Sequence, residues 1–539
     1  MSATLEHPPQ NETRQMQNEL PEPQADTLPD ASVLEDKTPA WLRTPAVSAV
    51  YVVILGTLLL VFANRPLWHT DLWDHVNYGE RILRARSLPS TEPLLPLASG
   101  MPMVNTAWLA QLGMAVLFER LGIAGIQFAC GLVIVLSIGT VSWAATRRSG
   151  SVVFGLLGAA VFLWMNMQQF LAVRPQLTGL LLYCILISVL LSGGFRRRAA
   201  WILLPLMFAV WANCHGSFAV GLLVMATTGV GHAISVLMRT RSITAALRSR
   251  RFVRLVLLTQ LCAVAVLLNP WGLDLYDTVL KIGTHPNIRS MFEWDPMTLR
   301  MKQGQAAAVM VCLLFLAVKL SPRHVRADEA LLLLVTGGMA LWSSRMVNWW
   351  APVMAVSIAG HGAAAWRSLR HRPRPTEARV RTGLWTVVNA GLCWVFFALT
   401  TLGVQVVHGK APDPHRALSR QTPLNAIEFL NAAETLPPGI TFMPAEWAGA
   451  VMQFGPHQLR PMVNLHVHVI PEEIWTDYIR LLAGPSDWNG LLDRYGINLV
   501  VAERGRNDRL MRLATDSGDW ETLYQDAQAV VLQRKQLIQ

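Results

Sequence analysis

Charged side chains are scarce in this chain. Only 15% of its 539 residues are Asp, Glu, Lys or Arg, whereas 52% are hydrophobic. This composition excludes an ordinary soluble protein and is typical of a membrane protein. The net charge of +11 comes from residues 45–405, which carry 31 basic and 12 acidic side chains, while residues 1–44 and 406–539 are both net acidic. Because the basic excess is confined to short loops between apolar segments, it indicates membrane topology, and nucleic acid is not expected as a partner.

Motifs for disulfides, zinc and nucleotides are also missing. The six cysteines all lie in apolar segments, none in a CxxC spacing, and residues 406–539 contain none. We therefore expect neither a disulfide framework nor a zinc site. His466 and His468 alternate in the C-terminal region with His457 nearby, but they lack carboxylate or cysteine partners. Exposed histidines are therefore expected there rather than a metal site.

Long apolar runs dominate the middle of the chain. Eleven are long enough to span a bilayer, which predicts a polytopic α-helical membrane protein with about 11 transmembrane helices. The runs cover residues 45–64, 122–144, 151–170, 177–194, 199–216, 218–238, 253–271, 303–320, 328–344, 347–365 and 384–404. The apolar segment 107–118 is too short to span, and it fits an interfacial or re-entrant helix better.

The arginines in the short loops predict the orientation of these helices. If the N-terminus lies inside, the inner loops together contain 19 arginines. The positive-inside rule then places the loops 65–106 and 272–302 on the outer side, together with residues 406–539. Residues 1–44 are rich in Pro, Gln and Glu, and we expect them to form a disordered cytoplasmic tail.

Residues 406–539 have the pattern of a small extracytoplasmic α/β domain. Short apolar strands are expected at 440–443, 461–465, 498–502 and 528–533. Helical patterns occur at 423–434, 446–454, 471–483, 488–495 and 507–516. No loop of the nucleotide-binding kind occurs among them.

The stretch 69–83, which follows the first apolar run, has the pattern of an amphipathic helix. Its apolar face would contain Leu72, Val76, Gly79 and Leu83. The neighbouring face would gather Asp71, Asp74, His75 and Tyr78. Such a helix can lie on a membrane with its apolar side down and hold two carboxylates and an imidazole at the water boundary. The alternative is an amphipathic connector whose acids are merely solvated.

Other polar residues recur at the expected outer ends of the helices. Ionisable groups at membrane depth tend to face a cavity and to have a function. Three of them can converge on one anionic ligand: Arg174, His215 and Arg345. Further candidates for the same cavity are Asn213, Asn269 and Glu293. The alternative for any single one is a helix-end side chain that reaches toward water.

These motifs follow one another in a definite order. After the acidic stretch come Arg174-Pro175-Gln176, Asn213-x-His215-Gly216, Asn269-Pro270-x-Gly272, Glu293-Trp294 and, in the C-terminal region, Glu446-Trp447-Ala-Gly and Leu492–Ile497. In this order they resemble bacterial multi-pass membrane proteins of the GT-C glycosyltransferase superfamily, of the type that depends on polyprenyl-phosphate sugars. The resemblance covers nearly all of residues 45–535.

The resemblance implies a GT-C-like transmembrane domain at 45–405 and an enzyme of the bacterial cytoplasmic (inner) membrane. Such an enzyme takes a sugar from a polyprenyl-phosphate carrier at the outer face and transfers it with inversion. Asp71 maps to the catalytic aspartate of the first outer loop, with Asp74 as a second acid and His75 as its orienting neighbour. The groups around the donor phosphate would be Arg174, His215 and Arg345. The donor sugar and the acceptor are not specified.

The sequence departs from the family pattern at two places. Asn105-Thr106-Ala107-Trp108 stands where an Asn-His-Glu-Trp-like stretch is expected, and Asn464-Leu465-His466 replaces Asp-Gly-Arg. Loss of an acid predicts altered specificity or a non-catalytic relative. A divalent metal between Asp71 and Asp74 is possible, although two carboxylates make an incomplete cage.

Two other classes of protein compete with the enzyme. A transporter or flippase for an anionic lipid would use the same arginines, but it would bind near the midplane between repeated halves. The sequence has no internal repeat and its polar residues cluster at one face, which favours surface chemistry. A non-catalytic membrane scaffold that presents the C-terminal domain is the third class.

Overall fold

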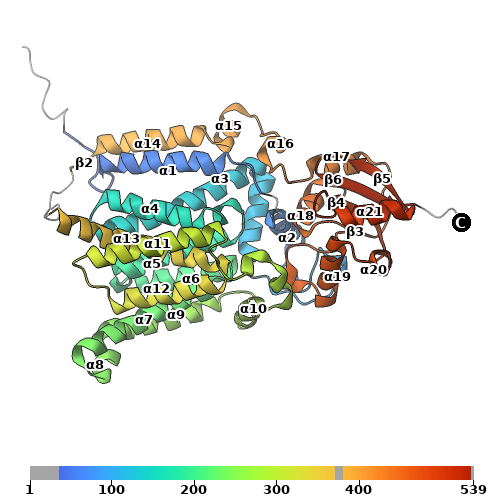
Figure 1. Ribbon diagram of the computed structural model, residues 1–539. Helices are drawn as coiled ribbons and strands as arrows, with labels where there is room; N and C mark the ends of the chain where they lie inside the picture. The colour runs from blue at the N-terminus through green and yellow to red at the C-terminus, as the bar shows by residue number, and fades with distance from the viewer. Residues whose placement is uncertain (1–34, 69, 371–379, 536–539) are drawn as a thin grey trace, which may run out of the picture.

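A computed structural model describes residues 35–68, 70–370 and 380–535. In these residues a bundle of long helices forms one part of the molecule, and an α/β unit projects from one end of it (Figure 1). The expected helical fold with a small C-terminal α/β sheet is thus confirmed. Most of the expected disordered tail at 1–44 lies outside the described residues, as does His69.

Every apolar run that the sequence marks as a span folds as a helix. These are α1 (Val47–Ala63), α3 (Trp108–Ser149), α4 (Val152–Asn166), α5 (Gln176–Ser192), α6 (Ala200–Cys214), α7 (Phe218–Thr240), α9 (Arg250–Val266), α11 (Lys302–Leu320), α12 (Ala327–Trp342), α13 (Val347–Leu369) and α14 (Gly383–Ala398). By length and apolar composition, α3, α7 and α11 can each cross a membrane, and α14 with α15 (Thr401–His408) makes a fourth span if this pair, bent by 87°, counts as one. The number of eleven spans stays a prediction.

Helix α3 is kinked at Gly122, whose φ of 63° is a conformation that glycine adopts readily. Residues 108–121 therefore form a helical arm that lies across the end of the bundle, and only the part after the kink runs along it (Figure 1). The short apolar segment 107–118 thus belongs to this arm, which packs against α2 (Leu72–Ala85).

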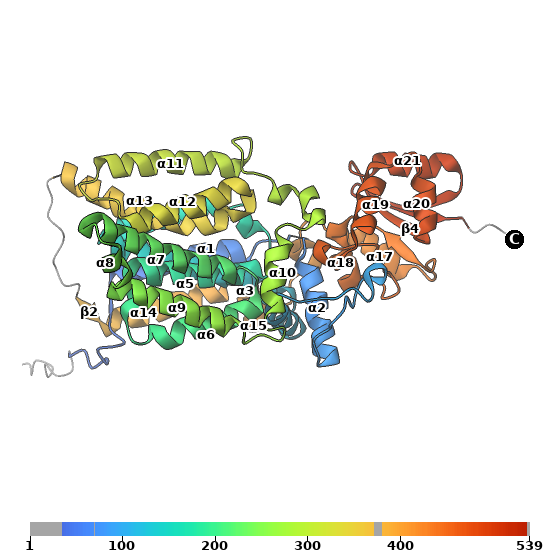
Figure 2. The same cartoon turned by 90° about the horizontal axis from the view of Figure 1, so that it is seen from below.

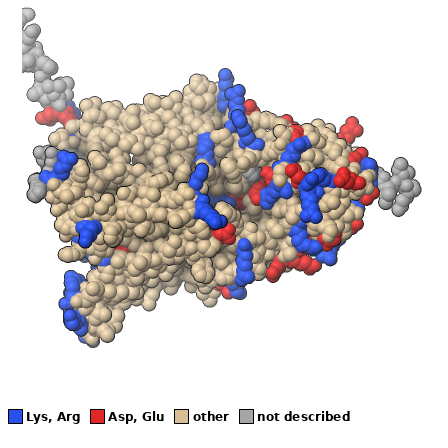
Figure 3. All heavy atoms as spheres, viewed as in Figure 1, with Lys and Arg blue, Asp and Glu red and all other residues tan. Residues whose placement is uncertain are grey.

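Charged side chains avoid the middle of the bundle. The visible side of the bundle in Figure 3 is nearly bare of charge, between basic groups at one end and mixed charges toward the α/β unit. The basic end carries α8 (Ile243–Leu247) and the two-residue ladder of β1 (Thr44–Pro45) with β2 (Arg381–Thr382), as Figure 2 shows from below. A long uncharged belt between two charged ends is the pattern of a membrane protein.

The α/β unit contains a four-stranded sheet in the order β3-β4-β6-β5. Its strands are β3 (Ile440–Phe442), β4 (Ile497–Glu503), β5 (Trp520–Gln525) and β6 (Ala529–Arg534), with β3 parallel to β4 and the other pairs antiparallel. Its helices are α17 (Leu424–Ala432), α18 (Ala445–Phe454), α19 (Glu472–Ala483), α20 (Trp488–Arg494) and α21 (Asp508–Ser517). The strand expected at 461–465 is wrong, because this segment makes only one bridge, from Pro461 to Thr441.

Helix α2 joins the bundle to the α/β unit. Leu72, Trp73 and Val76 are fully buried, and the Trp73 ring packs edge-on against Phe118 of the helical arm and Phe454 of α18. A Cβ added at Gly79 would meet the carbonyl oxygen of Gln111 at 2.1 Å, so the arm lies directly on this face. The expectation that α2 rests its apolar side on the membrane is therefore wrong, because protein covers that side.

Candidate functional site

A pocket of about 370 Å³ opens where the bundle, the loops 65–106 and 272–302 and the α/β unit meet. Its size is within the range of small-molecule sites. Helix α2 and the arm of α3 supply part of its wall. The rest comes from the segments before α5 and after α6, the start of α7, helix α10 (Asp274–Ile282), the loop 288–294, residues 345–349 and residues 465–468 of the α/β unit. Six of the residues singled out from the sequence line it: Asp71, His75, Arg174, His215, Glu293 and Arg345.

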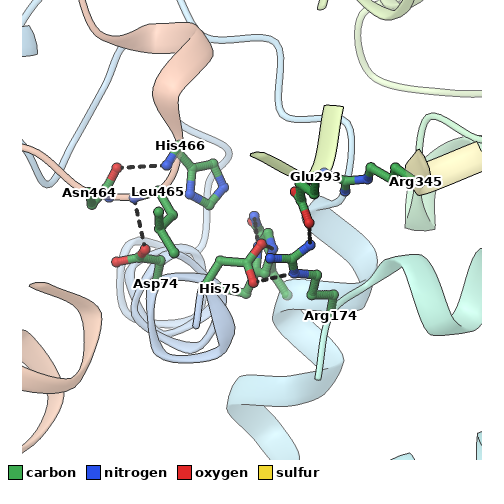
Figure 4. A network of polar contacts seen from close by, with 10 residues as sticks. Asp74, His75, Arg174, Glu293, Arg345, Asn464, Leu465 and His466 are labelled. Carbon is green, nitrogen blue, oxygen red and sulfur yellow. Dashed lines mark hydrogen bonds and ion pairs between the residues drawn. The ribbon is translucent and has the colours of Figure 1, made fainter. Parts of the chain in front are cut away.

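An alternating chain of acids and arginines crosses this pocket (Figure 4). Arg174 Nε donates to Asp71 Oδ1 at 2.7 Å, and Arg174 Nη1 donates to Glu293 Oε2 at 2.6 Å. Arg345 Nη1 donates to the other oxygen of Glu293 at 2.5 Å, and its guanidinium lies over the Trp294 ring. Two carboxylates therefore balance two guanidinium groups, and Glu293 bridges both arginines.

Asp71 is the residue just before α2, yet its side chain makes no capping hydrogen bond to that helix. Its Oδ1 is instead held by Arg174, whereas Oδ2 faces His75 Nε2 at 3.8 Å, beyond hydrogen-bond distance. Asp71 lines the pocket, and its side chain is 16% exposed. A carboxylate that is anchored through one oxygen and lines a pocket is suited to accept a proton from a bound hydroxyl.

Two buried side-chain amides position His75. Gln111 of the α3 arm contacts the ring, and Asn105 of the preceding loop holds Gln111. Asn105 Nδ2 donates to Gln111 Oε1 at 2.6 Å, and Gln111 Nε2 lies 3.1 Å from His75 Nδ1. Since the Gln111 amide group donates to Nδ1, the ring proton is assigned to Nε2, on the side of Asp71. Burial, with help from Arg174, lowers the pKa of His75 to about 3, so the ring is neutral at pH 7.

His215 lies just after α6 and is fixed in the same way. The backbone N–H of Ser217 donates to His215 Nδ1 at 3.0 Å, which leaves the proton on Nε2. Burial and the nearby Arg345 lower the pKa of His215 to about 3. His215 is therefore a neutral hydrogen-bond donor at pH 7, and its part in binding an anionic ligand stays a prediction.

Asp74 points away from the pocket and toward the α/β unit. Its side chain is 1% exposed, and Oδ2 accepts from the backbone N–H of Leu465 at 3.2 Å (Figure 4). A Cβ added at Gly449 of α18 would come within 2.7 Å of Asp74 Oδ1, so only glycine allows this approach. Burial raises the pKa of Asp74 well above its usual value, which favours the protonated acid. The structure thus separates the two acids by environment.

The segment around η8 (Val467–Val469) of the α/β unit covers the pocket from the outside. His466 is 7% exposed, and its ring lies 4.8 Å from the ring of His75 and 4.3 Å from that of Tyr78. Both His466 and His468 line the pocket, and burial lowers the pKa of His468 to about 4. The expectation of an exposed histidine is wrong for His466.

Two of the further candidates, Asn213 and Asn269, are not among the residues that line the pocket. Asn213 Nδ2 donates to the carbonyl oxygens of Ala209 and Leu268, and its Oδ1 accepts from Trp108 Nε1 at 2.7 Å. Asn269 Nδ2 donates to the carbonyl oxygens of Val266 and Gly272. Both side chains satisfy backbone groups where helices end, and their part in ligand binding stays a prediction.

The acids and histidines are not arranged around a metal ion. Within residues 35–68, 70–370 and 380–535, no group of three or more His, Cys, Asp and Glu side chains has the geometry to hold one. Asp71 contacts Arg174, whereas Asp74 faces Leu465 on the other side of α2. The two carboxylates are therefore directed to different partners.

Sequence reasoning missed the residues that support His75 and cover the pocket. Asn105 and Gln111 are buried amides. Asn105 belongs to the stretch 105–108 that departs from the family pattern, Gln111 follows that stretch, and Leu465 and His466 belong to the other departing stretch. Both departures therefore fall at this site. The common location of the two stretches in the structure indicates that they act together, but no spacing in the sequence predicts that location.

Similar folds occur among solved structures. No protein-family model and no curated protein matches the sequence. Among solved structures, the oligosaccharyltransferase AglB from Archaeoglobus fulgidus, in complex with an inhibitory peptide and a dolichol-phosphate, is 10% identical with a TM-score of 0.52 over 85% of this chain and 69% of its own. ArnT from Cupriavidus metallidurans, bound to undecaprenyl phosphate, is 14% identical with a TM-score of 0.52 over 90% of this chain and 97% of its own. The chain therefore has the GT-C fold.

Proposed function

We propose that the protein is a membrane glycosyltransferase that moves a sugar from a polyprenyl-phosphate donor to an acceptor hydroxyl. The observation that carries this proposal is the pocket in which Asp71 meets Arg174 and Arg345 beside the α/β unit. The GT-C fold supports it, since both AglB and ArnT have been seen with a polyprenyl phosphate bound. We place the pocket at the outer face of the membrane, on the strength of the arginine-rich loops at the other end of the bundle.

In the proposed reaction, Asp71 Oδ2 takes the proton of the acceptor hydroxyl. The acceptor oxygen forms a bond to the anomeric carbon while the bond from that carbon to the phosphate oxygen breaks, through an oxocarbenium-like state. The polyprenyl phosphate leaves with both bonding electrons, and the anomeric configuration is inverted. The hydrogen bond from Arg174 to Asp71 Oδ1 fixes the direction of this carboxylate.

Arg174 and Arg345 would hold the departing phosphate. Each guanidinium has five N–H groups, and the hydrogen bonds to Asp71 and Glu293 leave others for an anion. Fixed cations in a partly dry pocket stabilise developing charge more than they would in water. His215 adds a neutral N–H rather than a charge.

The test is transfer by the purified full-length protein in liposomes, with radiolabelled polyprenyl-phosphate sugars as donors. A panel of donors is needed because the sugar is unknown, and slow release of sugar to water is measured as well as transfer to lipid or glycan acceptors. Asp71→Asn is expected to abolish both reactions. The matched control Asp487→Asn, which alters an exposed acid of the α/β unit, is expected to keep full activity. Equal activity of Asp71→Asn and the unmutated protein would contradict the proposal and leave lipid transport or a scaffold as the better description.

A further inference from the structure

A second pocket of about 520 Å³ lies at the end of the bundle away from the candidate site. Helix α5 begins beside Arg174 and ends at Ser192, which lines the second pocket, so the two are separated by about 25 Å at 1.5 Å per residue. We call it the arginine pocket, because five arginines line it: Arg147, Arg148, Arg323, Arg326 and Arg367.

Two carboxylates of the described residues pair with arginines at the arginine pocket. Glu329 pairs with Arg148, and Asp328 pairs with Arg326 and also with Arg251. Both carboxylates therefore contact arginines of the lining, Arg148 and Arg326. Positive-inside topology explains why arginines occur in these loops, but it does not explain why they converge on one hollow from α3, α13 and the loop before α12.

Arg148 is deeply buried at the arginine pocket. Its side chain is 7% exposed, and among the described residues its Nε has no hydrogen-bond partner. A buried N–H without a partner is costly, and an anion in the pocket would remove that cost. The floor is glycine: a Cβ at Gly360 would lie 3.2 Å from both Arg148 Nε and Arg323 Nη1. The absence of a side chain there lets the two guanidinium groups approach each other.

Exposed tryptophans mark the level of the arginine pocket in the membrane. Trp143 is 51% exposed with the guanidinium of Arg147 over its ring, and Trp366 is 49% exposed with that of Arg370 over its ring. Tryptophans beside arginines at a helix end are typical of the boundary between lipid tails and headgroups. The pocket therefore lies where a lipid phosphate is found.

We propose that the arginine pocket binds a phosphate group, as the headgroup of an anionic membrane lipid or as a free phosphate. Guanidinium groups bind phosphate oxygens through paired hydrogen bonds, and several of them can share one phosphate. The interfacial tryptophans favour the lipid as the source. This site is independent of the candidate active site and of the reaction proposed there.

The test is thermal unfolding of the purified full-length protein in a neutral detergent. The added probes are a short-chain phosphatidylglycerol, a phosphatidylcholine of the same chain length, and inorganic phosphate. A ligand that binds the folded protein raises its melting temperature. Phosphatidylglycerol is expected to do so, with an effect that weakens at high salt, and phosphatidylcholine is not. A shift with inorganic phosphate as well would assign the site to free phosphate.

Variants decide whether the arginine pocket causes the shift. Arg147→Gln with Arg323→Gln is expected to raise the half-saturating phosphatidylglycerol concentration at least tenfold. Arg239→Gln with Arg248→Gln removes the same charge at the same end outside the pocket and is expected to leave it unchanged. Gly360→Leu fills the floor without altering charge, and it should weaken binding even if the double arginine variant does not fold. Equal binding by the pocket and control variants, or no shift with any anionic probe, would overturn the proposal.

Discussion

Glu293 offers the sharpest test of how the candidate site is held together. Its carboxylate bridges Arg174 and Arg345, and the three side chains are 25%, 12% and 20% exposed. Removing one partner of a fully buried pair costs about 3–5 kcal/mol, whereas exposed pairs contribute about 0.2–1 kcal/mol. Because these side chains are mostly buried and Arg174 keeps Asp71, Glu293→Gln is expected to lower the free energy of unfolding by about 2 kcal/mol.

The same change is expected to strengthen phosphate binding. Burial opposes ionisation of Glu293, but Arg345 and Arg174 outweigh it and lower its pKa, so the side chain is an anion at pH 7. It therefore occupies guanidinium groups that the donor phosphate would use. With glutamine there, undecaprenyl phosphate should stabilise the variant more than the unmutated protein, because the two arginines regain an anionic partner.

The measurement is thermal unfolding of both proteins with and without undecaprenyl phosphate. Glu446→Gln is the matched control, since it breaks the more exposed pair of Glu446 with Arg506 at 2.9 Å and should cost at most about 1 kcal/mol. Our reasoning fails if Glu293→Gln is as stable as this control. It also fails if the lipid phosphate stabilises Glu293→Gln no more than the unmutated protein.

Three further predictions concern the acids, a histidine and the topology. Asp74→Asn should retain most sugar transfer while Asp71→Asn loses it, because burial favours the protonated form of Asp74, which asparagine imitates; equal losses would contradict this. The folded pKa of His75 is about 3 against 6.5 unfolded, so the unfolded chain binds more protons below pH 6.5 and stability falls as the pH drops toward 3. Melting temperatures of His75→Gln should therefore change less between pH 6.5 and 4.5 than those of the unmutated protein, and identical profiles would refute the assignment. Alkaline phosphatase fused after residue 410 should be active if residues 406–539 lie outside, and an inactive fusion would place them inside.

The bundle helices could be predicted from the sequence because their signal is local. A run of apolar residues such as 303–320 specifies a helix without reference to its neighbours, and α11 begins and ends within one residue of it. The helices of the α/β unit follow their periodicity equally well, as α19 shows. The segment 461–465 was misassigned because its apolar residues are buried by packing against α2 and residues 95–103 instead of by strand pairing. Packing against other elements and pairing in a sheet can produce the same alternation of apolar and polar residues in a sequence.

The candidate site was only partly predictable, because the direction of a side chain depends on packing between distant segments. Arg174 and Arg345 could be identified because a cation at membrane depth is costly and tends to face a cavity. The pocket that both arginines line is such a cavity. The direction of each side chain was not identifiable. Asp71 and Asp74 share a helix face in sequence, but Asp71 lies just before α2 and turns to Arg174, while Asp74 turns to the α/β unit.

The two departures from the family pattern are best understood through the charge of the pocket. Asp71 and Glu293 already balance Arg174 and Arg345, and the histidines around them are neutral. An acid at position 107, where Ala107 stands in place of the glutamate of the family pattern, would leave a negative excess that repels a phosphate. Asn105, which the pattern shares, and Gln111 orient His75 through hydrogen bonds without adding charge. This arrangement keeps every group that the proposed transfer needs, so the departures favour a change of specificity over a loss of catalysis.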